Sequence, residues 1–411
     1  MKLLLIHHRM PYPLHSGMDK ARFNLIKTLN PEHDVTLLFP FDSSQRLVIP
    51  EELIGICKTI IPVPVIPKHE SIKKEKAEYF LRLVNLILFR IPTYISNDYQ
   101  PELAKRVEEL TTRNKYDAVQ ALSDVTGKYI ENVSGNTFTI CGPMDDTLTS
   151  SWTDLLVETR FRKKIGWLLE YRARRYWQPK ICDKTNVSLF FSRKDKENVQ
   201  KYCKKSTRIL VIPASIEADN SWNPESVNKV EKNSIIFVGG LGSLFNQHAV
   251  HFFVKKILPL IEKRCPDYKL YIVGQSPDKS ILNLRNEQII VTGKIDDIVP
   301  YIEKAAVYVS PLYAGSGVKT KIIEALRFGK AIVSTNSGIQ GIWELGNDVI
   351  YVDDDPEKFA NHVIYLLKND EIRKQKSFKA RQLFEKEYAF EKVKPEILKV
   401  YQQIKNDYIE N

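Results

Sequence analysis

The 411-residue sequence contains few cysteines, and none of them form a pair with metal-binding spacing. Five are scattered along the chain without a CxxC motif: Cys57, Cys141, Cys182, Cys203 and Cys265. An odd, dispersed set argues against a disulfide framework and against a structural zinc site. The eight histidines are also dispersed without ligand spacing. We therefore expect reduced thiols and no bound metal.

Long apolar runs are also lacking. The apolar start of the chain ends at His7, too early for a signal peptide. No run approaches the roughly 20 residues that span a bilayer. The longest, residues 79–89, is short and contains Arg82. These absences predict a cytoplasmic protein.

Acidic residues are too few to balance the basic ones, and the formal net charge is +11. The stretch from Arg160 to Lys180 holds eight basic residues against Glu170 alone, a local charge of 8 − 1 = +7. Interleaved Trp and Tyr favour a basic amphipathic helix that lies on an anionic membrane surface. A solvated, charged helix face is the alternative. A second basic stretch runs from Lys68 to Arg90. No nucleic-acid-binding motif is present, so no nucleic acid partner is expected.

Short β-branched runs alternate with helical segments along the whole chain. This rhythm is typical of parallel sheets covered by helices. The pattern restarts near residue 208, after which residues 213–233 look like a linker. We predict an α/β fold with two tandem doubly wound, Rossmann-like domains, residues 1–207 and 208–389. A final helix, 390–411, is expected to pack back toward the first domain. In such sheets ligands bind at the carboxyl ends of the strands, so a cleft between the two sheets is the expected site.

The segment from Ser310 to Leu326 carries the clearest chemical signal. It follows a predicted strand, and a small-residue loop, Gly315–Ser316–Gly317, then opens a helix. The first-turn N–H groups and the positive helix end favour an anion. Lys319 and Lys321 add positive charge, and Glu324 could accept hydrogen bonds from hydroxyls such as those of a ribose. A diphosphate would suit this segment, although a solvated Glu–Lys pair at an ordinary helix end is an equal alternative.

This segment resembles the donor-binding signature of GT-B-fold glycosyltransferases of family 4, the glycosyl transferases group 1. The resemblance implies that Glu324 binds the ribose and that the loop through Gly317 and Val318 binds the nucleotide diphosphate. Many members have another Glu eight residues before that one, where this chain has Ser316. A branch with the pattern G-x-G-x-[KR]-x-K also lacks it. In that branch Lys319 and Lys321 are the natural phosphate partners.

Other parts of the chain resemble the same family. Gly240 follows the first strand of the second domain, and Gly293 with Lys294 resembles the loop near the base. Members commonly carry an Arg/Lys pair after that first strand, and this chain has none after Gly240. The segment Val211 to Glu217 stands where members often have V-P-N-G-V-D, from which Ala214 departs.

The N-terminal segment His8-Arg9-Met10-Pro11-Tyr12-Pro13 resembles the opening of bacterial exopolysaccharide-cluster sugar transferases. The resemblance places Gly17 near the donor phosphates and makes Arg22 a candidate contact for an anionic acceptor. It also implies a retaining, metal-independent glycosyltransferase with a nucleotide-sugar donor, no cofactor and a saccharide or lipid-linked acceptor. A side-chain helper would come from strand ends of the first domain, where Asp124 and Asp146 stand. A helix-cap or turn role is an equal alternative for both.

Two other functions stay open. A catalytically degenerate GT-B protein could serve as an interaction subunit, because the first Glu is missing and the segment around Ala214 is altered. A nucleotide-sugar epimerase would share the fold. It would lack the loop-to-Glu signature that ends at Glu324.

Overall fold

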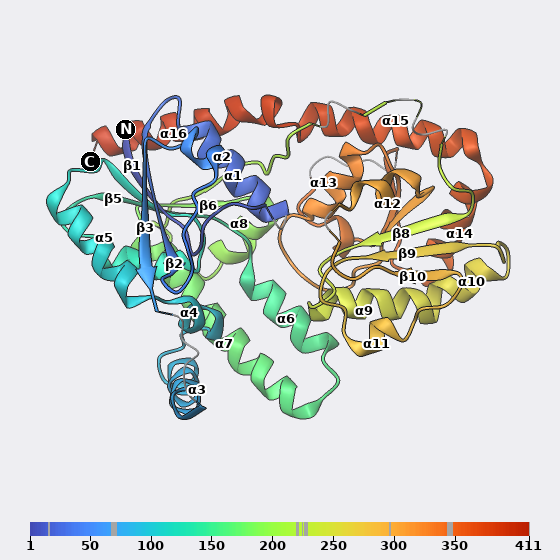
Figure 1. Ribbon diagram of the computed structural model, residues 1–411, viewed down its shortest axis with the longest axis horizontal. Coiled ribbons are helices and arrows are strands. Elements are labelled where there is room, and N and C mark those ends of the chain that lie inside the picture. The colour runs from blue at the N-terminus through green and yellow to red at the C-terminus, as the bar shows by residue number, and fades with distance from the viewer. Residues whose placement is uncertain are drawn as a thin grey trace. The chain divides into compact units, whose positions relative to one another are not determined.

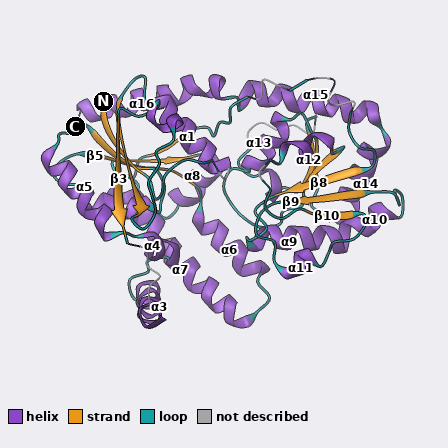
Figure 2. Ribbon diagram, viewed as in Figure 1, coloured by secondary structure: helices purple, strands orange, loops and turns teal. Residues whose placement is uncertain are grey.

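The computed structural model contains two compact α/β units (Figure 1). It describes residues 1–14, 17–66, 72–218, 222–223, 225, 229–295, 297–342 and 348–410. Unit 1 comprises Met1–Trp152, Arg160–Ser215 and Val393–Asn411, and unit 2 comprises Thr153–Thr159 and Ile216–Lys392. Each unit holds a parallel sheet with helices on its faces (Figure 2). The predicted α/β fold with two Rossmann-like domains is therefore confirmed.

The sheet of unit 1 has seven strands in the order β3-β2-β1-β4-β5-β6-β7. Its pairings are parallel. The chain winds outward in both directions from β1, which is the doubly wound arrangement. The strands are β1 (Lys2–Ile6), β2 (Asp34–Asp42), β3 (Thr59–Val65), β4 (Ala118–Ala121), β5 (Phe138–Met144), β6 (Val187–Phe190) and β7 (Ile209–Val211).

Strand β7 corrects one detail of the predicted domain boundary. The sequence pattern placed residue 208 at the start of the second domain, yet β7 is the last strand of the first sheet, parallel to β6. A short apolar run reveals that a strand exists but not which sheet it joins. The second sheet begins later, at Ser234.

Helices cover both faces of the first sheet, and the C-terminal helix joins them. They are α1 (Gly17–Leu29), α2 (Glu51–Ile54), α3 (Ile72–Ile87), α4 (Thr93–Asp98), α5 (Pro101–Arg113), a 3-10 helix (Thr126–Asn132), α7 (Phe161–Lys184), α8 (Arg193–Gln200) and α16 (Phe390–Glu410). Helix α6 (Thr147–Val157) begins in unit 1 and ends in unit 2. The hydroxyl of Tyr401 in α16 donates to Gln120 Oε1 of β4 at 2.7 Å, in the buried interior. This polar contact fixes how α16 packs on unit 1.

The sheet of unit 2 has six strands in the order β10-β9-β8-β11-β12-β13, again with parallel pairings. The strands are β8 (Ser234–Val238), β9 (Lys269–Val273), β10 (Ile289–Val291), β11 (Val307–Ser310), β12 (Ala331–Ser334) and β13 (Ile350–Val352). The helices are α9 (Leu244–Phe252), a π-helical turn (Phe253–Ile257), α10 (Leu258–Glu262), α11 (Lys279–Leu282), α12 (Val299–Lys304), α13 (Thr320–Arg327), a 3-10 turn (Ser337–Ile339), α14 (Pro356–Lys368) and α15 (Asp370–Glu387).

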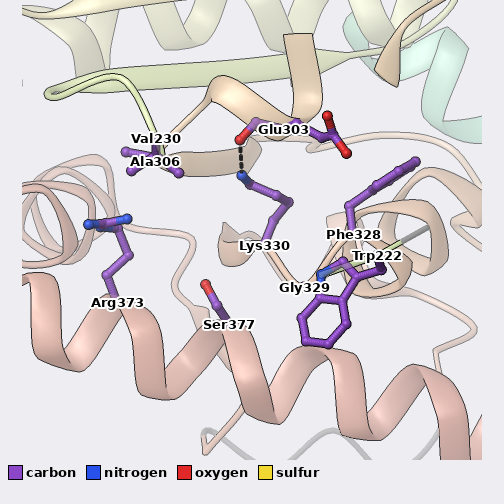
Figure 3. A pocket seen from close by; sticks show the side chains of 9 residues that line it. All are labelled: Trp222, Val230, Glu303, Ala306, Phe328, Gly329, Lys330, Arg373 and Ser377. Carbon is purple, nitrogen blue, oxygen red and sulfur yellow. Dashed lines mark hydrogen bonds between the residues drawn. The ribbon is translucent and has the colours of Figure 1, made fainter. Parts of the chain in front are cut away.

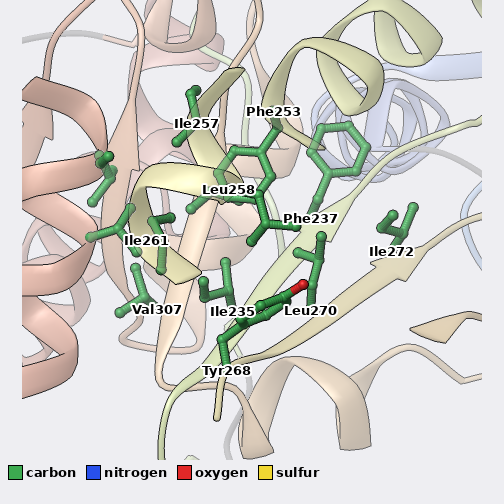
Figure 4. Packing of buried hydrophobic residues seen from close by; sticks show 14 of the residues in the cluster. Ile235, Phe237, Phe253, Ile257, Leu258, Ile261, Tyr268, Leu270, Ile272 and Val307 are labelled. Carbon is green, nitrogen blue, oxygen red and sulfur yellow. The ribbon is translucent and has the colours of Figure 1, made fainter. Parts of the chain in front are cut away.

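The core of unit 2 forms where helical residues pack on the central strands (Figure 4). Phe253, Ile257 and Ile261 recur every four residues, so they share one face and bury against the sheet. Ile235 and Val307 meet them from β8 and β11. These strands are almost wholly apolar because helices cover both faces of a parallel sheet. The buried core holds the strand ends, and hence the loops that follow them, in place.

Candidate functional site

The glycine loop between β11 and α13 has the backbone conformation that its sequence requires. Strand β11 ends at Ser310 and α13 begins at Thr320, as the sequence pattern predicted. Gly315 has φ of 101° and Gly317 has φ of 77°. Side-chain-bearing residues rarely adopt this left-handed region, so both glycines serve the turn itself. The loop delivers the chain to the N-terminus of α13, where free N–H groups favour an anion.

Two lysines lie at this helix start. Lys319 is only 6% exposed, and its Nζ donates to the Ser316 carbonyl at 2.7 Å. Lys321 Nζ donates to Asn246 Oδ1 at 2.8 Å. Burial, reinforced by the charge of Lys319, lowers the pKa of Lys321 to about 7. Two close cations at a helix N-terminus repel one another, and a bound anion would stabilise the charged form of both.

Glu324 stands one turn further along α13. It is 9% exposed, and Ile323 and Ala325 on either side of it in the sequence are also buried. Burial raises the pKa of Tyr308 on β11 well above its ordinary value, and the charge of Glu324 adds to this effect. Glu324 therefore lies near β11 at the base of the loop. The alternative of a solvated Glu–Lys pair does not describe Glu324, because this residue is buried.

The other predicted donor-binding residues of unit 2 also follow the carboxyl ends of strands in the second sheet. Gly240 follows β8, and Gly293 and Lys294 follow β10. Strand β8 is the neighbour of β11, whereas β10 is the edge strand. Asn246 connects the first of these loops to α13, because its Nδ2 donates to the Gly240 carbonyl at 2.9 Å. Lys294 is exposed. Asn246 thus links the Gly240 loop to Lys321, whereas Lys294 lies after β10, the outermost strand of the sheet.

A supporting loop after β12 was missed by sequence reasoning. Ser334 Oγ donates to the Ser310 carbonyl at 3.2 Å, and Lys319 N donates to the Gln340 carbonyl at 3.3 Å. A Cβ on Gly338 would lie 2.2 Å from Ser334 Oγ and 2.5 Å from the Ser310 carbonyl oxygen, so only glycine fits. The available signal was Gly338 itself, a glycine shortly after the apolar run of residues 331–333. This loop therefore contacts the glycine loop at both of its ends, at Ser310 and at Lys319.

In unit 1 the N-terminal motif forms a compact charged cluster. Arg9 donates to both carboxylate oxygens of Asp19 in α1, at 2.7 and 2.9 Å. His7 is 1% exposed, and its Nδ1 lies 2.6 Å from the Arg9 carbonyl oxygen. Burial lowers the pKa of His7 well below its ordinary value and that of His8 to about 4, so both imidazoles are neutral at pH 7.

Arg22, predicted to meet an anionic acceptor, lies in α1, which begins at Gly17. Burial lowers its pKa, while Asp145, Asp124 and Asp19 act in the opposite direction. Its charge therefore already has carboxylate partners in the fold. The roles of Gly17 and Arg22 in substrate binding stay predictions.

The two predicted carboxylate helpers are engaged in structural contacts. Asp124 follows β4 and accepts from the Tyr94 hydroxyl at 2.5 Å and from Val125 N at 3.0 Å. Asp146 is fully buried and accepts from Thr149 N and from Asn198 Nδ2, both at 2.9 Å. The Thr149 contact is that of an N-terminal cap on α6. A catalytic role for either carboxylate stays a prediction.

A small cavity lies at the amino-terminal ends of the strands of the second sheet, away from the glycine loop (Figure 3). Ala306 and Lys330, which line it, directly precede β11 and β12, whereas the glycine loop follows β11. Lys330 Nζ donates to the Glu303 carbonyl at 3.0 Å and so satisfies the end of α12. Burial lowers the pKa of Lys330 to about 7. We assign this cavity no part in the candidate site.

The residues that the structure describes bear on metal binding and on membrane crossing. Among them, no group of three or more His, Cys, Asp or Glu could hold a metal ion. Within the same residues, no helix is long and apolar enough to cross a membrane.

Residues 232–369 match the family model described as Glycosyl transferases group 1. An uncharacterized 44.6 kDa protein in the cps region of Klebsiella pneumoniae is 21% identical, covering 97% of this chain and 99% of that protein. The uncharacterized glycosyltransferase MJ1069 of Methanocaldococcus jannaschii is 25% identical over 47% of this chain and 50% of its own length.

Solved glycosyltransferase structures share the fold. Sucrose-phosphate synthase from Thermosynechococcus elongatus superposes with a TM-score of 0.70 at 14% identity, covering 99% of this chain and 100% of that one. HepE of Anabaena in complex with UDP and glucose gives 0.66 at 13% identity, covering 98% and 99%. TarM of S. aureus in a complex that contains UDP gives 0.67 at 11% identity, covering 98% and 100%. With the family-model match, this fold supports a GT-B glycosyltransferase. Membership of family 4 stays a prediction.

Proposed function

We propose that this protein transfers a sugar from a nucleotide-diphosphate donor to a saccharide or lipid-linked acceptor, with the diphosphate bound at the glycine loop of unit 2. One observation carries the proposal. Lys319 and Lys321 lie together at the N-terminus of α13, and the pKa of Lys321 is lowered by burial and by its neighbour. A bound anion with two negative charges would stabilise the ammonium of Lys321 against both its burial and the charge of Lys319.

The shape of the loop supports the same ligand. Gly315 and Gly317 present backbone without side chains, so a phosphate can approach closely. Glu324 offers acceptor oxygens to sugar hydroxyls, as a ribose requires. A carboxylate one turn from two cations suits a nucleotide whose diphosphate and ribose occupy neighbouring positions. Uridine nucleotides are the first to test, because the solved structures of HepE and TarM contain UDP.

The reaction follows from this arrangement. The bond between the sugar's anomeric carbon and the β-phosphate oxygen breaks, and a bond to the acceptor hydroxyl oxygen forms. Lys319, Lys321 and the start of α13 stabilise the negative charge that develops on the leaving diphosphate. We propose retention of the anomeric configuration, with the hydroxyl proton passing to the departing phosphate. Positioning and charge stabilisation are then the protein's main contributions.

A role in bacterial surface polysaccharide synthesis is the biological setting that we propose. The relative from Klebsiella pneumoniae aligns along nearly the whole chain and is described as encoded in a cps region. Such a pathway would supply a lipid-linked or saccharide acceptor. The absence of any need for a metal or cofactor belongs to the same proposal.

The donor site is tested by a thermal-shift screen against UDP-, GDP-, ADP- and TDP-linked sugars. A ligand at 100 times its Kd stabilises the folded state by about 2.7 kcal/mol. We expect one nucleotide to raise Tm, and Lys321→Ala and Glu324→Ala to abolish the shift. Lys330→Ala is the matched control, since the pKa of Lys330 is likewise lowered to about 7 but this lysine lies at the opposite ends of the strands.

The screen also separates the alternatives. No shift from the folded wild-type protein with any nucleotide sugar would overturn the proposal. Nucleotide binding without transfer to any supplied acceptor would favour the interaction-subunit alternative. Conversion of the donor sugar without an acceptor would favour an epimerase.

Membrane association is a second part of the proposal, and it rests on exposed apolar side chains in α7. Phe161, Ile165 and Leu168 are 77%, 48% and 46% exposed and share one face of α7 by their spacing. Arg162 and Lys164 are exposed beside them. Apolar residues flanked by cations suit an anionic lipid surface. The second half of α7 is mixed, because Ala173 and Trp177 are buried whereas Arg175 and Tyr176 are exposed. The predicted stretch from Arg160 to Lys180 therefore contributes mainly through its start.

Helix α3 extends this surface. It packs against α7, and Leu88 and Phe89, which follow α3, are 70% and 60% exposed. The guanidinium of Arg90 lies 5.5 Å from the Tyr176 ring of α7, which joins the two segments. The start of the second basic stretch, residues 68–71, lies outside the described residues.

Sedimentation with vesicles of mixed anionic and neutral phospholipids tests this surface. We expect wild-type protein to co-sediment at low salt and the double variant Phe161→Ser/Ile165→Ser to stay in the supernatant. Ile409→Ser is the control, because Ile409 is also an exposed apolar residue, at 68%, but lies in α16. Equal sedimentation of all three proteins would contradict a membrane role for α7.

A further inference from the structure

Asn246 links the loop after β8 to the start of α13. Its side chain is 4% exposed, its Nδ2 donates to the Gly240 carbonyl at 2.9 Å, and its Oδ1 accepts from Lys321 Nζ at 2.8 Å. A Cβ on Gly239 would lie 3.0 to 3.1 Å from three atoms of this amide, so the amide packs tightly on the loop. Asn246 is therefore fixed on both sides, and it fixes the ammonium of Lys321.

The contacts that the structure describes for the Lys321 ammonium are with a neutral amide and two aromatic rings. Its Nζ lies 5.0 Å from the centre of the Phe237 ring and 6.0 Å from that of Phe245, and aromatic faces attract a cation. The amide oxygen of Asn246 accepts a hydrogen bond but carries no net charge. A carboxylate at this position would pair with the ammonium and cancel its field. An amide orients the ammonium and leaves its charge available to a ligand.

We propose that Asn246 is a positioning residue of the donor site, whose neutral amide holds the Lys321 ammonium at the start of α13 without neutralising it. The proposal rests on the proposed donor site and adds a residue that acts through Lys321 rather than on the ligand. It also accounts for the lack of a basic pair in the loop after β8. In this protein the cation is Lys321 of α13, and Asn246 of α9 holds it by a hydrogen bond.

A purely structural role for Asn246 makes a different prediction. Gln247, the next residue of α9, tethers the same loop, since its Nε2 donates to the Leu241 carbonyl at 2.9 Å. If Asn246 served only to tether the loop, replacing either residue would have similar consequences. If Asn246 positions Lys321, only its own replacement changes how Lys321 titrates.

The experiment uses Asn246→Asp, Asn246→Leu and Gln247→Leu in the full chain. The first readout needs no ligand: mass spectrometry measures the acylation rate of Lys321 from pH 6 to 10, which reports the neutral amine. We expect the midpoint to rise by at least about one unit in Asn246→Asp, because a carboxylate stabilises the ammonium. It should fall in Asn246→Leu, which removes the acceptor, and stay unchanged in Gln247→Leu.

The second readout is the Kd for the nucleotide sugar that the screen identifies, measured at pH 6.5. We expect about tenfold or greater weakening in Asn246→Asp, because its carboxylate both neutralises Lys321 and repels the diphosphate. Gln247→Leu should stay within about twofold of wild type, as expected for a change that leaves the charges of the site unaltered. An unchanged Lys321 midpoint in both Asn246 variants, or an equal shift in Gln247→Leu, would overturn the proposal.

The two readouts keep this proposal separate from the proposed function. If no nucleotide sugar binds the wild-type protein, the donor site fails. The acylation midpoints still decide whether Asn246 sets the state of Lys321. Urea unfolding of each variant confirms that the compared proteins are folded.

Discussion

Donor binding should weaken as the pH rises through neutrality. Lys321 has its pKa lowered from 10.5 to about 7, first by burial and then by Lys319. Above pH 7 the free site therefore loses this proton, whereas a bound diphosphate favours the ammonium and raises its pKa. Binding then takes up a proton, and Kd must increase with pH.

The size of the effect follows from the pKa. If the diphosphate requires the charged lysine, the apparent Kd is multiplied by 1 + 10^(pH − pKa). Between pH 6 and pH 8.5 this amounts to a weakening of roughly 30-fold, or about 2 kcal/mol. The full 30-fold change in Kd is reached only if the pKa of Lys321 in the complex exceeds 8.5, so 30-fold is an upper value.

Isothermal titration calorimetry with a nucleotide sugar measures this dependence. Both phosphates of such a ligand are esterified, so neither titrates in this range. Repeating the titration in buffers of different ionisation enthalpy counts the protons taken up. Lys321→Arg is the control, because a guanidinium stays charged throughout and should give a flat profile. A flat wild-type profile, or the same slope in Lys321→Arg, would refute the reasoning.

Two predictions concern the stability of unit 2. The pKa of Lys330 is also lowered to about 7, so between pH 7 and 10.5 the unfolded state binds more protons and the lysine's unfavourable contribution fades as pH rises. Lys330→Met should therefore gain unfolding free energy relative to wild type near pH 7, and the gain should shrink at pH 9, as measured by urea denaturation. Gly338→Ala should lower the unfolding free energy by about 2 kcal/mol or more, because its Cβ would lie 2.2 Å from Ser334 Oγ. An unaltered denaturation midpoint would show that the loop after β12 relaxes freely.

The fold could be predicted because its signals are local. Alternating β-branched runs and helical segments indicated two doubly wound units, and both sheets are parallel. The loop at Gly315 and Gly317 was also predicted as a small-residue segment that opens a helix, whereas its left-handed backbone is a finding of the structure. Assignment of β7 to a sheet was not local, because strand pairing is decided by tertiary packing.

The environment of the site residues could not be read from the sequence. Lys321 meets Asn246, which lies 75 positions earlier in the chain. The sequence around either residue does not predict this contact. The burial of Lys319 was equally hidden, because a lysine in a loop is ordinarily solvated. The sequence indicated which charges gather at α13, while packing decides their protonation.

The carboxylate of Asp146 provides the sharpest remaining question about the reaction. It is fully buried and accepts hydrogen bonds from Thr149 N and Asn198 Nδ2, so its oxygens are already engaged within the fold. Asp146→Asn replaces an acceptor by a donor at the start of α6, so we expect a loss of about 1–2 kcal/mol in unfolding free energy.

Turnover by the folded fraction of Asp146→Asn should fall only a few-fold if the leaving diphosphate accepts the acceptor's proton. General-base catalysis contributes about 10²- to 10⁴-fold. A fall of that size in a variant with wild-type stability would instead make Asp146 the base. Initial rates at saturating donor, normalised to the folded fraction, distinguish these outcomes because a helix cap alters stability while a base alters turnover.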